Sequence, residues 1–233
     1  MNKFIYPIAF MAFVLGLLFA GAAAAQATYT FMPPGNYTVV QPDATPGCSI
    51  APCADYTAGM TVTGSFTTAS VLPPNFSGNA YPLLQSFSFN DGLTTYASSD
   101  AQVTVRYFDL TTDATGAITG FNVLIQRWRT ATPTVGSGAV DNRFDMVQMT
   151  GVLTAGENEM ECAFAIGASP GAAVPNSCTG WQGSLDYTYA TAPVGSFVLT
   201  AAVPTLSEWA MILFGVLLAG GAALMVQRRR MAA

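Results

Sequence analysis

Histidine is absent from this chain of 233 residues. This absence excludes the Ser–His and Cys–His nucleophile pairs, and it removes the commonest proton shuttle and the favoured ligand of transition metals. The catalysis that remains open is that of a carboxylate pair, as in glycoside hydrolases, which place two Asp or Glu side chains about 5 to 10 Å apart. Nothing in the sequence indicates a cofactor, and we expect none.

Positive charge is also scarce. Between residues 26 and 203 there is no lysine, and twelve acids face only four arginines, so the net charge of this segment is −8. The arginines are Arg106, Arg127, Arg129 and Arg143. Because an acidic surface repels phosphate backbones, we expect no nucleic-acid partner.

Long apolar runs are missing from this interior and occur only at the two ends. Residues 1–27 begin with a single Lys3, continue as an apolar run over residues 4–19 and finish with small residues. This is the layout of a secretory signal peptide, and cleavage can follow Ala25 or Ala27, where the last and third-last side chains are small. An uncleaved transmembrane helix is less favoured because the segment after the apolar run is rich in alanine. We expect an extracytoplasmic domain over residues 28–202.

The four cysteines, an even number, agree with export to an oxidising compartment. Nearness along the chain favours pairing Cys48 with Cys53 and Cys162 with Cys178, although three connectivities are formally open. The second bridge would close a loop of about 15 residues and stabilise the fold by roughly 3 kcal/mol. A zinc site is the alternative, but no histidine is present and the spacings fit no zinc ribbon, so we expect no metal.

Short alternating stretches, broken by Gly, Pro, Asn and Asp, dominate the interior and predict β-strands. Met60, Val62 and Phe66 fall on one face of such a stretch, and Phe87 and Phe89 precede an Asn-Asp-Gly turn. Further candidates are residues 37–40, 143–153, 159–166, 181–189 and 196–202.

The clearest pattern is a hairpin over residues 101–130 with its tip near residues 113–116. On the first strand we expect one face formed by Val103, Val105 and Tyr107, and the other by Thr104, Arg106 and Phe108. On the second strand we expect one face formed by Phe121, Val123 and Ile125, and the other by Leu124 and Trp128. Since both faces of the second strand carry apolar residues, it should lie inside a sheet. About nine or ten strands result, which predicts one all-β domain, an antiparallel sandwich or barrel.

Three acids, Glu157, Glu159 and Glu161, lie two residues apart in a predicted strand. On a regular strand all three point to one face, opposite Met160 and Cys162. Such a row could bind calcium or supply catalytic carboxylates, with Asp145 as a further candidate. Alternation alone predicts a solvated polar face, and we favour that interpretation.

Two other clusters have structural and functional interpretations. Asp109 and Asp113 lie four residues apart with no acidic closing ligand, so a hairpin turn explains them better than a calcium loop. On a strand, Arg127 and Arg129 share a face while Trp128 points the other way. We expect Trp128 in the core and the arginines paired with acids of neighbouring strands, with contact to an anionic sugar as the less favoured alternative.

The C-terminus has three elements in order: a polar motif, an apolar run and a basic cluster. Residues 209–226 contain no charge over 18 residues, about 27 Å as a helix and close to the thickness of a bilayer. The three arginines that follow predict a stop-transfer signal in the cytoplasm and an N-outside, C-inside topology. They are Arg228, Arg229 and Arg230.

The polar motif resembles the IPTL-CTERM protein-sorting signal of Gram-negative bacteria, which is related to the PEP-CTERM signal. It comprises Val203, Pro204, Thr205, Leu206, Ser207, Glu208 and Trp209, followed by Ala210. The usual form begins with Ile and ends with Trp-Gly, so this chain departs from it at Val203 and Ala210. The resemblance covers residues 203–230 and implies processing by an exosortase-like transpeptidase, after which the protein passes from the inner membrane to the cell surface or matrix.

Two hypotheses for function follow. The first is a non-enzymatic, disulfide-bonded surface or extracellular-matrix protein, with polysaccharide as a candidate ligand. The second is an extracellular carbohydrate-active enzyme that uses paired carboxylates. The first is favoured because the chain has no histidine and no recognisable catalytic motif.

Overall fold

The computed structural model describes residues 26–42, 55–130, 142–165, 177–203, 212–222 and 225. The chain divides into one compact unit, Ala27–Ala202, and a second unit formed by its two ends, and each is considered by itself. Several predicted features lie outside the described residues: the signal peptide through residue 25, Cys48, Cys53, most of the sorting motif (Pro204, Thr205, Leu206, Ser207, Glu208, Trp209) and the stop-transfer arginines (Arg228, Arg229, Arg230).

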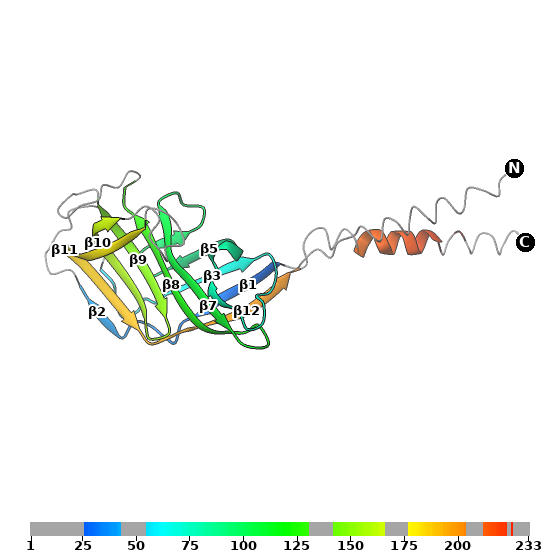
Figure 1. The fold of residues 1–233 in the computed structure, drawn as a ribbon, viewed down its shortest axis with the longest axis horizontal. Helices are drawn as coiled ribbons and strands as arrows, with labels where there is room; N and C mark the ends of the chain where they lie inside the picture. The colour runs from blue at the N-terminus through cyan, green and yellow to red at the C-terminus, as the bar shows by residue number, and fades with distance from the viewer. Residues whose placement is uncertain are drawn as a thin grey trace, which may run out of the picture. The chain divides into compact units, whose positions relative to one another are not determined.

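The strands of the folded unit form two antiparallel sheets (Figure 1). The five-stranded sheet has the order β12 (Ser196–Val203), β1 (Gln26–Met32), β3 (Thr63–Thr68), β5 (Leu84–Asn90) and β6 (Thr95–Ala97). The seven-stranded sheet has the order β2 (Val39–Gln41), β11 (Cys178–Ala192), β10 (Thr154–Ala165), β9 (Arg143–Thr150), β8 (Ile118–Trp128), β7 (Val103–Thr112) and β4 (Ser77–Asn79). The predicted all-β, antiparallel class is confirmed, and the two-sheet alternative is the one observed.

An aromatic core fills the space between the sheets. Phe66 of β3 meets Phe108 of β7 edge to face at 5.2 Å between ring centroids, and Phe197 of β12 meets Phe121 of β8 at the same distance. Alternation of side chains on each strand puts these rings inward and polar residues outward. Edge-to-face rings stabilise such contacts beyond their buried area.

The hairpin prediction is confirmed, with β7 and β8 joined by a turn between Thr112 and Ile118. One detail is wrong: Phe108 lies in the core, whereas Tyr107 packs on the outer face of the sheet. The pairing shifts register between Val105 and Tyr107, so Arg106 is an extra residue on β7. Such a bulge reverses the alternation of every following side chain. Strands β1, β4 and β6 were not predicted.

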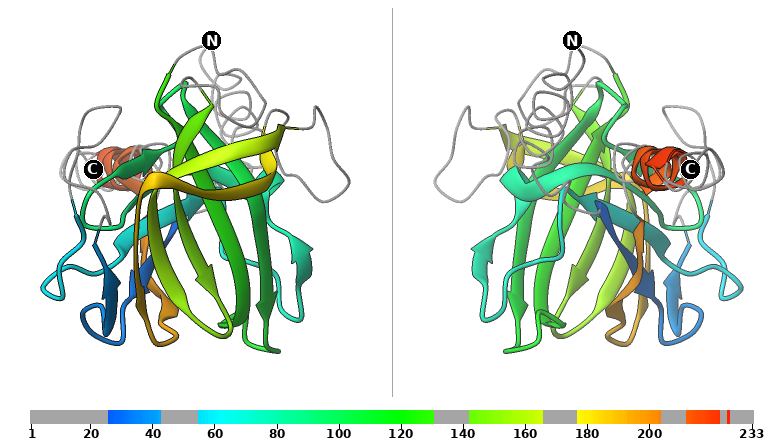
Figure 2. Two further views of the ribbon diagram at one scale, coloured as in Figure 1. Left: turned by 90° about the vertical axis from the view of Figure 1, so that its left-hand side faces the viewer. Right: turned by 90° about the vertical axis from the view of Figure 1, so that its right-hand side faces the viewer.

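A second apolar cluster covers the outer face of the seven-stranded sheet. Leu124, Trp128, Phe144, Met146 and Met160 are its buried members, together with both described cysteines. The end of β10 and the start of β11 curl over this face (Figure 2). The prediction that Trp128 belongs to the core is therefore confirmed.

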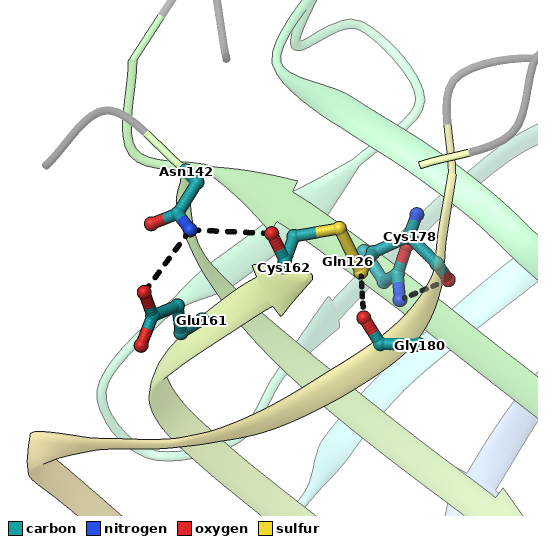
Figure 3. Close-up of a disulfide and its surroundings, with 6 residues drawn as sticks. All are labelled: Gln126, Asn142, Glu161, Cys162, Cys178 and Gly180. Carbon is teal, nitrogen blue, oxygen red and sulfur yellow. Dashed lines mark hydrogen bonds between the residues drawn. A yellow bond between two sulfur atoms is a disulfide. The ribbon is translucent and has the colours of Figure 1, made fainter. Parts of the chain in front are cut away.

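The Cys162–Cys178 disulfide joins the curled ends of β10 and β11, with a distance of 5.8 Å between Cα atoms. Gln126 of β8, fully buried, donates to the carbonyl of Cys178 at 3.1 Å and accepts the N–H of the same residue at 2.8 Å (Figure 3). These hydrogen bonds hold the curled ends of β10 and β11 against the sheet. The predicted pairing of Cys162 with Cys178 is confirmed.

The second unit contains a helix over residues 212–222. Within the described parts of the chain, none of the helices combines the length and the apolar character that a membrane span requires.

The position of β1 distinguishes the two expected cleavage sites of the signal peptide. Ala27 is fully buried and pairs with Thr68 of β3. Cleavage after Ala27 would remove this core residue, whereas cleavage after Ala25 leaves β1 complete. We predict that N-terminal sequencing of the exported protein finds Gln26 first. A mature N-terminus at Thr28 would contradict this prediction.

Candidate functional site

Ionisable residues are distributed very unevenly between the two sheets. No strand of the five-stranded sheet contains a charged residue, whereas β7, β8, β9, β10 and β11 all contain at least one. The densest group lies where β8, β9 and β10 run side by side. This group is the candidate site because buried charges require specific partners.

A β-bulge on β10 rearranges the row of glutamates. The pairing of β10 shifts register between Asn158 and Met160, and Glu159 has a positive φ of 61°. The bulge leaves Glu157 on the outer face, where its Oε2 accepts the hydroxyl of Tyr187 at 3.1 Å. Glu159 instead contacts Arg129. The prediction that all three glutamates share one face is wrong, because the extra residue breaks the two-residue period.

Arg129 is the centre of the buried charge network. Its Nε donates to Asp145 Oδ1 at 2.8 Å and its Nη1 to Glu159 Oε1 at 2.7 Å. Its Nη2 donates to the side-chain oxygen of Asn158. The side chains of Arg129, Asp145 and Glu159 are only 2 to 4 % exposed. One guanidinium therefore holds two carboxylates inside the protein. Removal of Arg129 would leave both carboxylates without a counter-charge, whereas neutralising one carboxylate leaves an Arg–carboxylate pair.

Within this network, the pKa of Glu159 is shifted far from its ordinary value. Burial, opposed by Arg129 and reinforced by the nearby Asp186 and Asp145, raises the pKa of its carboxyl to about 7. Its Oε2 atom is buried and forms no hydrogen bond. A carboxyl group with this pKa can give or take a proton near neutral pH.

Glu161 is buried as well. Its carboxylate accepts from Asn142 Nδ2 at 3.3 Å and Gln182 Nε2 at 3.4 Å, and Arg143 Nη1 lies 3.5 Å away. The favoured expectation of a solvated polar face is therefore wrong for both Glu159 and Glu161. The curl of β10 and β11 and the bulge enclose side chains that simple alternation places in solvent.

A second polar centre forms around Asp91, which is fully buried. Its Oδ2 accepts the hydroxyls of Tyr56 and Tyr96 at 2.7 and 2.8 Å, and its Oδ1 accepts the N–H groups of Leu93 and Thr94 at 2.9 and 2.7 Å. Burial raises the pKa of the Asp91 carboxyl, and these four bonds oppose that rise. Sequence reasoning identified this residue only as part of a turn.

The two polar centres are joined by Thr94. Its hydroxyl donates to Asp145 Oδ2 at 3.2 Å, while its N–H belongs to the Asp91 centre. The β5–β6 turn of the five-stranded sheet is thereby tied to β9 of the other sheet. This link fixes the two sheets relative to each other beside the buried charges.

A pocket of about 380 Å³ opens beside this link. Its polar lining comprises Thr94, Thr95, Asp100, Arg127, Arg129 and Asp145. We call it the Arg–Asp pocket, because Arg127 Nε donates to Asp100 at 2.8 Å just as Arg129 does to Asp145. The predicted pairing with acids of neighbouring strands is confirmed for Arg129, whose partners lie on β9 and β10. Arg127 also pairs with an acid, but Asp100 lies between β6 and β7 rather than on a strand.

The acids of the hairpin have a structural role. Asp113 Oδ1 accepts the N–H groups of Thr115 and Ala117 at 2.8 and 3.0 Å, which closes the turn. Asp109 lies within β7, opposite Asn122 of β8. The turn interpretation of Asp113 is confirmed, whereas Asp109 is a strand residue.

The raised pKa of Glu159 predicts a pH-dependent stability. The ordinary pKa of a glutamate is 4.5. Between this pH and about pH 7, Glu159 keeps its proton in the folded protein but has lost it in the unfolded chain. The stabilisation is thus complete below pH 4.5 and disappears as the pH rises through 7. We expect Glu159→Gln to raise the free energy of unfolding at pH 8, by up to about 3 kcal/mol, and to change it little at pH 4. Urea denaturation at both pH values tests this, and equal destabilisation at both would contradict it.

Comparison with known proteins identifies the C-terminus. Residues 201–230 match the family model of the IPTL-CTERM motif. No curated protein and no solved structure matches the chain. Strand β12 runs to Val203, the first residue of the motif expected from the sequence. Residues 201–230 thus carry the IPTL-CTERM motif, a C-terminal sorting signal of exported proteins.

Proposed function

We propose that this chain is a non-enzymatic surface or extracellular-matrix protein that an exosortase-like enzyme releases from its C-terminal tail and that binds polysaccharide through the Arg–Asp pocket. The single observation that carries the sorting role is the match of residues 201–230 to the IPTL-CTERM motif. Before processing, the apolar tail holds the domain at the inner membrane with its N-terminus outside. The Cys162–Cys178 disulfide is consistent with an oxidising compartment.

The chemistry of the Arg–Asp pocket supports a sugar ligand. The side chains of Arg127 and Asp100 are 30 and 29 % exposed, so this ion pair is partly accessible to a ligand. Neighbouring hydroxyls of a sugar can donate to the carboxylate and accept from the guanidinium. Leu93 and Ala97 also line the pocket and offer apolar contact to C–H groups. This mixture of a few polar groups on an apolar wall is typical of small-ligand sites.

An enzyme is the second candidate function. The observation in its favour is that Glu159, whose pKa burial raises to about 7, shares Arg129 with a second carboxylate, that of Asp145. Glycoside hydrolases divide the roles of acid and base between two such carboxylates. The non-enzymatic proposal is preferred because Glu159 is only 2 % exposed and does not line the pocket.

The sorting role predicts two forms of the protein in an exporting bacterium that has the processing enzyme. Intact-mass measurement of the parent should find a surface or medium form that has lost the C-terminal tail. Replacing Pro204, Thr205 and Leu206 by alanine should leave an intact tail in the inner-membrane fraction. Thr119→Ala, an exposed change on β8, serves as the control and should be processed normally. An uncleaved parent found only in the inner membrane would refute the proposal.

The ligand role predicts binding without turnover. The purified protein should be retarded in gels that contain a soluble polysaccharide, and Arg127→Met should weaken this binding about tenfold because a donor and its paired acceptor are both disturbed. Arg127→Lys, which keeps the positive charge, should weaken polysaccharide binding less than Arg127→Met does. New reducing ends should not appear in the same samples. Their appearance, with loss in Glu159→Gln, would favour the enzyme instead.

A further inference from the structure

The five-stranded sheet has a polar outer face without any charge. None of its strands contains Asp, Glu, Lys or Arg, although the chain as a whole carries 21 such residues, eight basic and thirteen acidic. Inward-facing residues of β1, β3 and β5 are aromatic, including Tyr29, Phe66 and Phe89. The outward-facing residues between them are almost all serine and threonine. Hydroxyl groups are therefore the main polar side-chain groups of this face.

The hydroxyls form rows across the strands. Thr28 lies opposite Thr67, which lies opposite Ser86, and the Oγ atoms of Thr67 and Ser86 are 2.8 Å apart. A parallel row two residues away contains Thr30, Ser65 and Ser88. A hydroxyl has one donor and two acceptor sites, so each member of a row keeps capacity for a further bond. The spacing of strands and of alternate residues makes these rows regular.

A second pocket, of about 410 Å³, begins at the end of one row. Its lining includes Tyr81, Pro82, Gln85, Ser86, Phe87 and Ser98, none of them charged. We call it the Tyr81 pocket. It lies at the edge of the sheet, since β6 pairs only with Ser88–Asn90, and in the described residues no strand continues this pairing alongside residues 84–87.

The Tyr81 pocket combines a ring with hydrogen-bonding groups. Tyr81 packs against the main core, which holds its ring in place while it lines the pocket. Ser98 Oγ accepts the N–H of Phe87 at 3.2 Å and keeps its own proton for a ligand. Gln85 adds an exposed amide. A flat ring beside neutral donors and acceptors suits the apolar face and the hydroxyl edge of a sugar ring.

We propose that the Tyr81 pocket binds one residue of an uncharged polysaccharide, whose chain continues along the row of hydroxyls that runs from Ser86 through Thr67 to Thr28. The inference rests on the polysaccharide-binding role proposed above and adds a second site and a ligand class. Transfer of a neutral polysaccharide from water to this face costs little free energy, because hydroxyls of the protein replace its hydrogen bonds to water. A charged polysaccharide would meet no counter-charge on this face. Polyanions are further disfavoured by the net negative charge of the domain.

Affinity electrophoresis of the full chain in mild detergent tests this inference, with a soluble neutral glucan and a polyuronate as the two probes. The parent should be retarded by the glucan and not by the polyuronate. Tyr81→Ala, which removes the ring, and Ser86→Glu, which puts a charge at the head of the row, should each weaken glucan binding about tenfold. Tyr81→Phe should bind like the parent, because the ring remains.

Thr119→Glu is the matched control, since it places the same charge at an exposed position of β8 in the other sheet. Circular dichroism should show that every variant is folded. Glucan binding that is lost in Arg127→Met but unchanged in Tyr81→Ala and Ser86→Glu would overturn this inference and leave the proposed function standing. Absence of binding by the parent to either probe would overturn both the inference and the polysaccharide role, but not the sorting role.

Discussion

The interior of the seven-stranded sheet depends on the contacts of one guanidinium group, that of Arg129. It follows the end of β8 and binds a carboxylate of β9 together with a carboxylate and an amide of β10. Because these carboxylates are buried, Arg129 is needed to offset the free-energy cost of their charges. Arg129 contacts Glu159 at its bulge, opposes the rise in the pKa of that carboxyl caused by burial, and also lines the Arg–Asp pocket.

The Asp91 centre extends the same constraint to the second sheet. The Asp91 carboxylate accepts the hydroxyls of Tyr56 and Tyr96. The hydroxyl of Thr94 donates to Asp145 of the other sheet. The fit is tight: a Cβ atom added at Gly156 of β10 would lie 2.7 Å from the hydroxyl of Tyr56. A fully satisfied buried polar network of this kind specifies a unique packing of the sheets, since any displacement leaves polar groups without partners.

The two faces of the sandwich have separate chemistry. Charge is concentrated in the seven-stranded sheet, where it is buried or paired, and the five-stranded sheet is neutral. Edge strands are commonly protected from other chains by lysine or other charges. Here β12 has none, and its exposed Val198 and Leu199 lie just before the sorting signal.

The sequence by itself determined the features that depend on local patterns: the all-β class, the β7–β8 hairpin, the Cys162–Cys178 pairing, the burial of Trp128 and the C-terminal motif. Alternation, turn chemistry and nearness along the chain are all short-range. Tertiary structure alone decided the bulges at Arg106 and Glu159, because an inserted residue changes the facing of side chains without changing the residue types that follow. It also decided the burial of Glu159 and Glu161 and the role of Asp91, whose partners are distant in sequence and meet only when the two sheets pack.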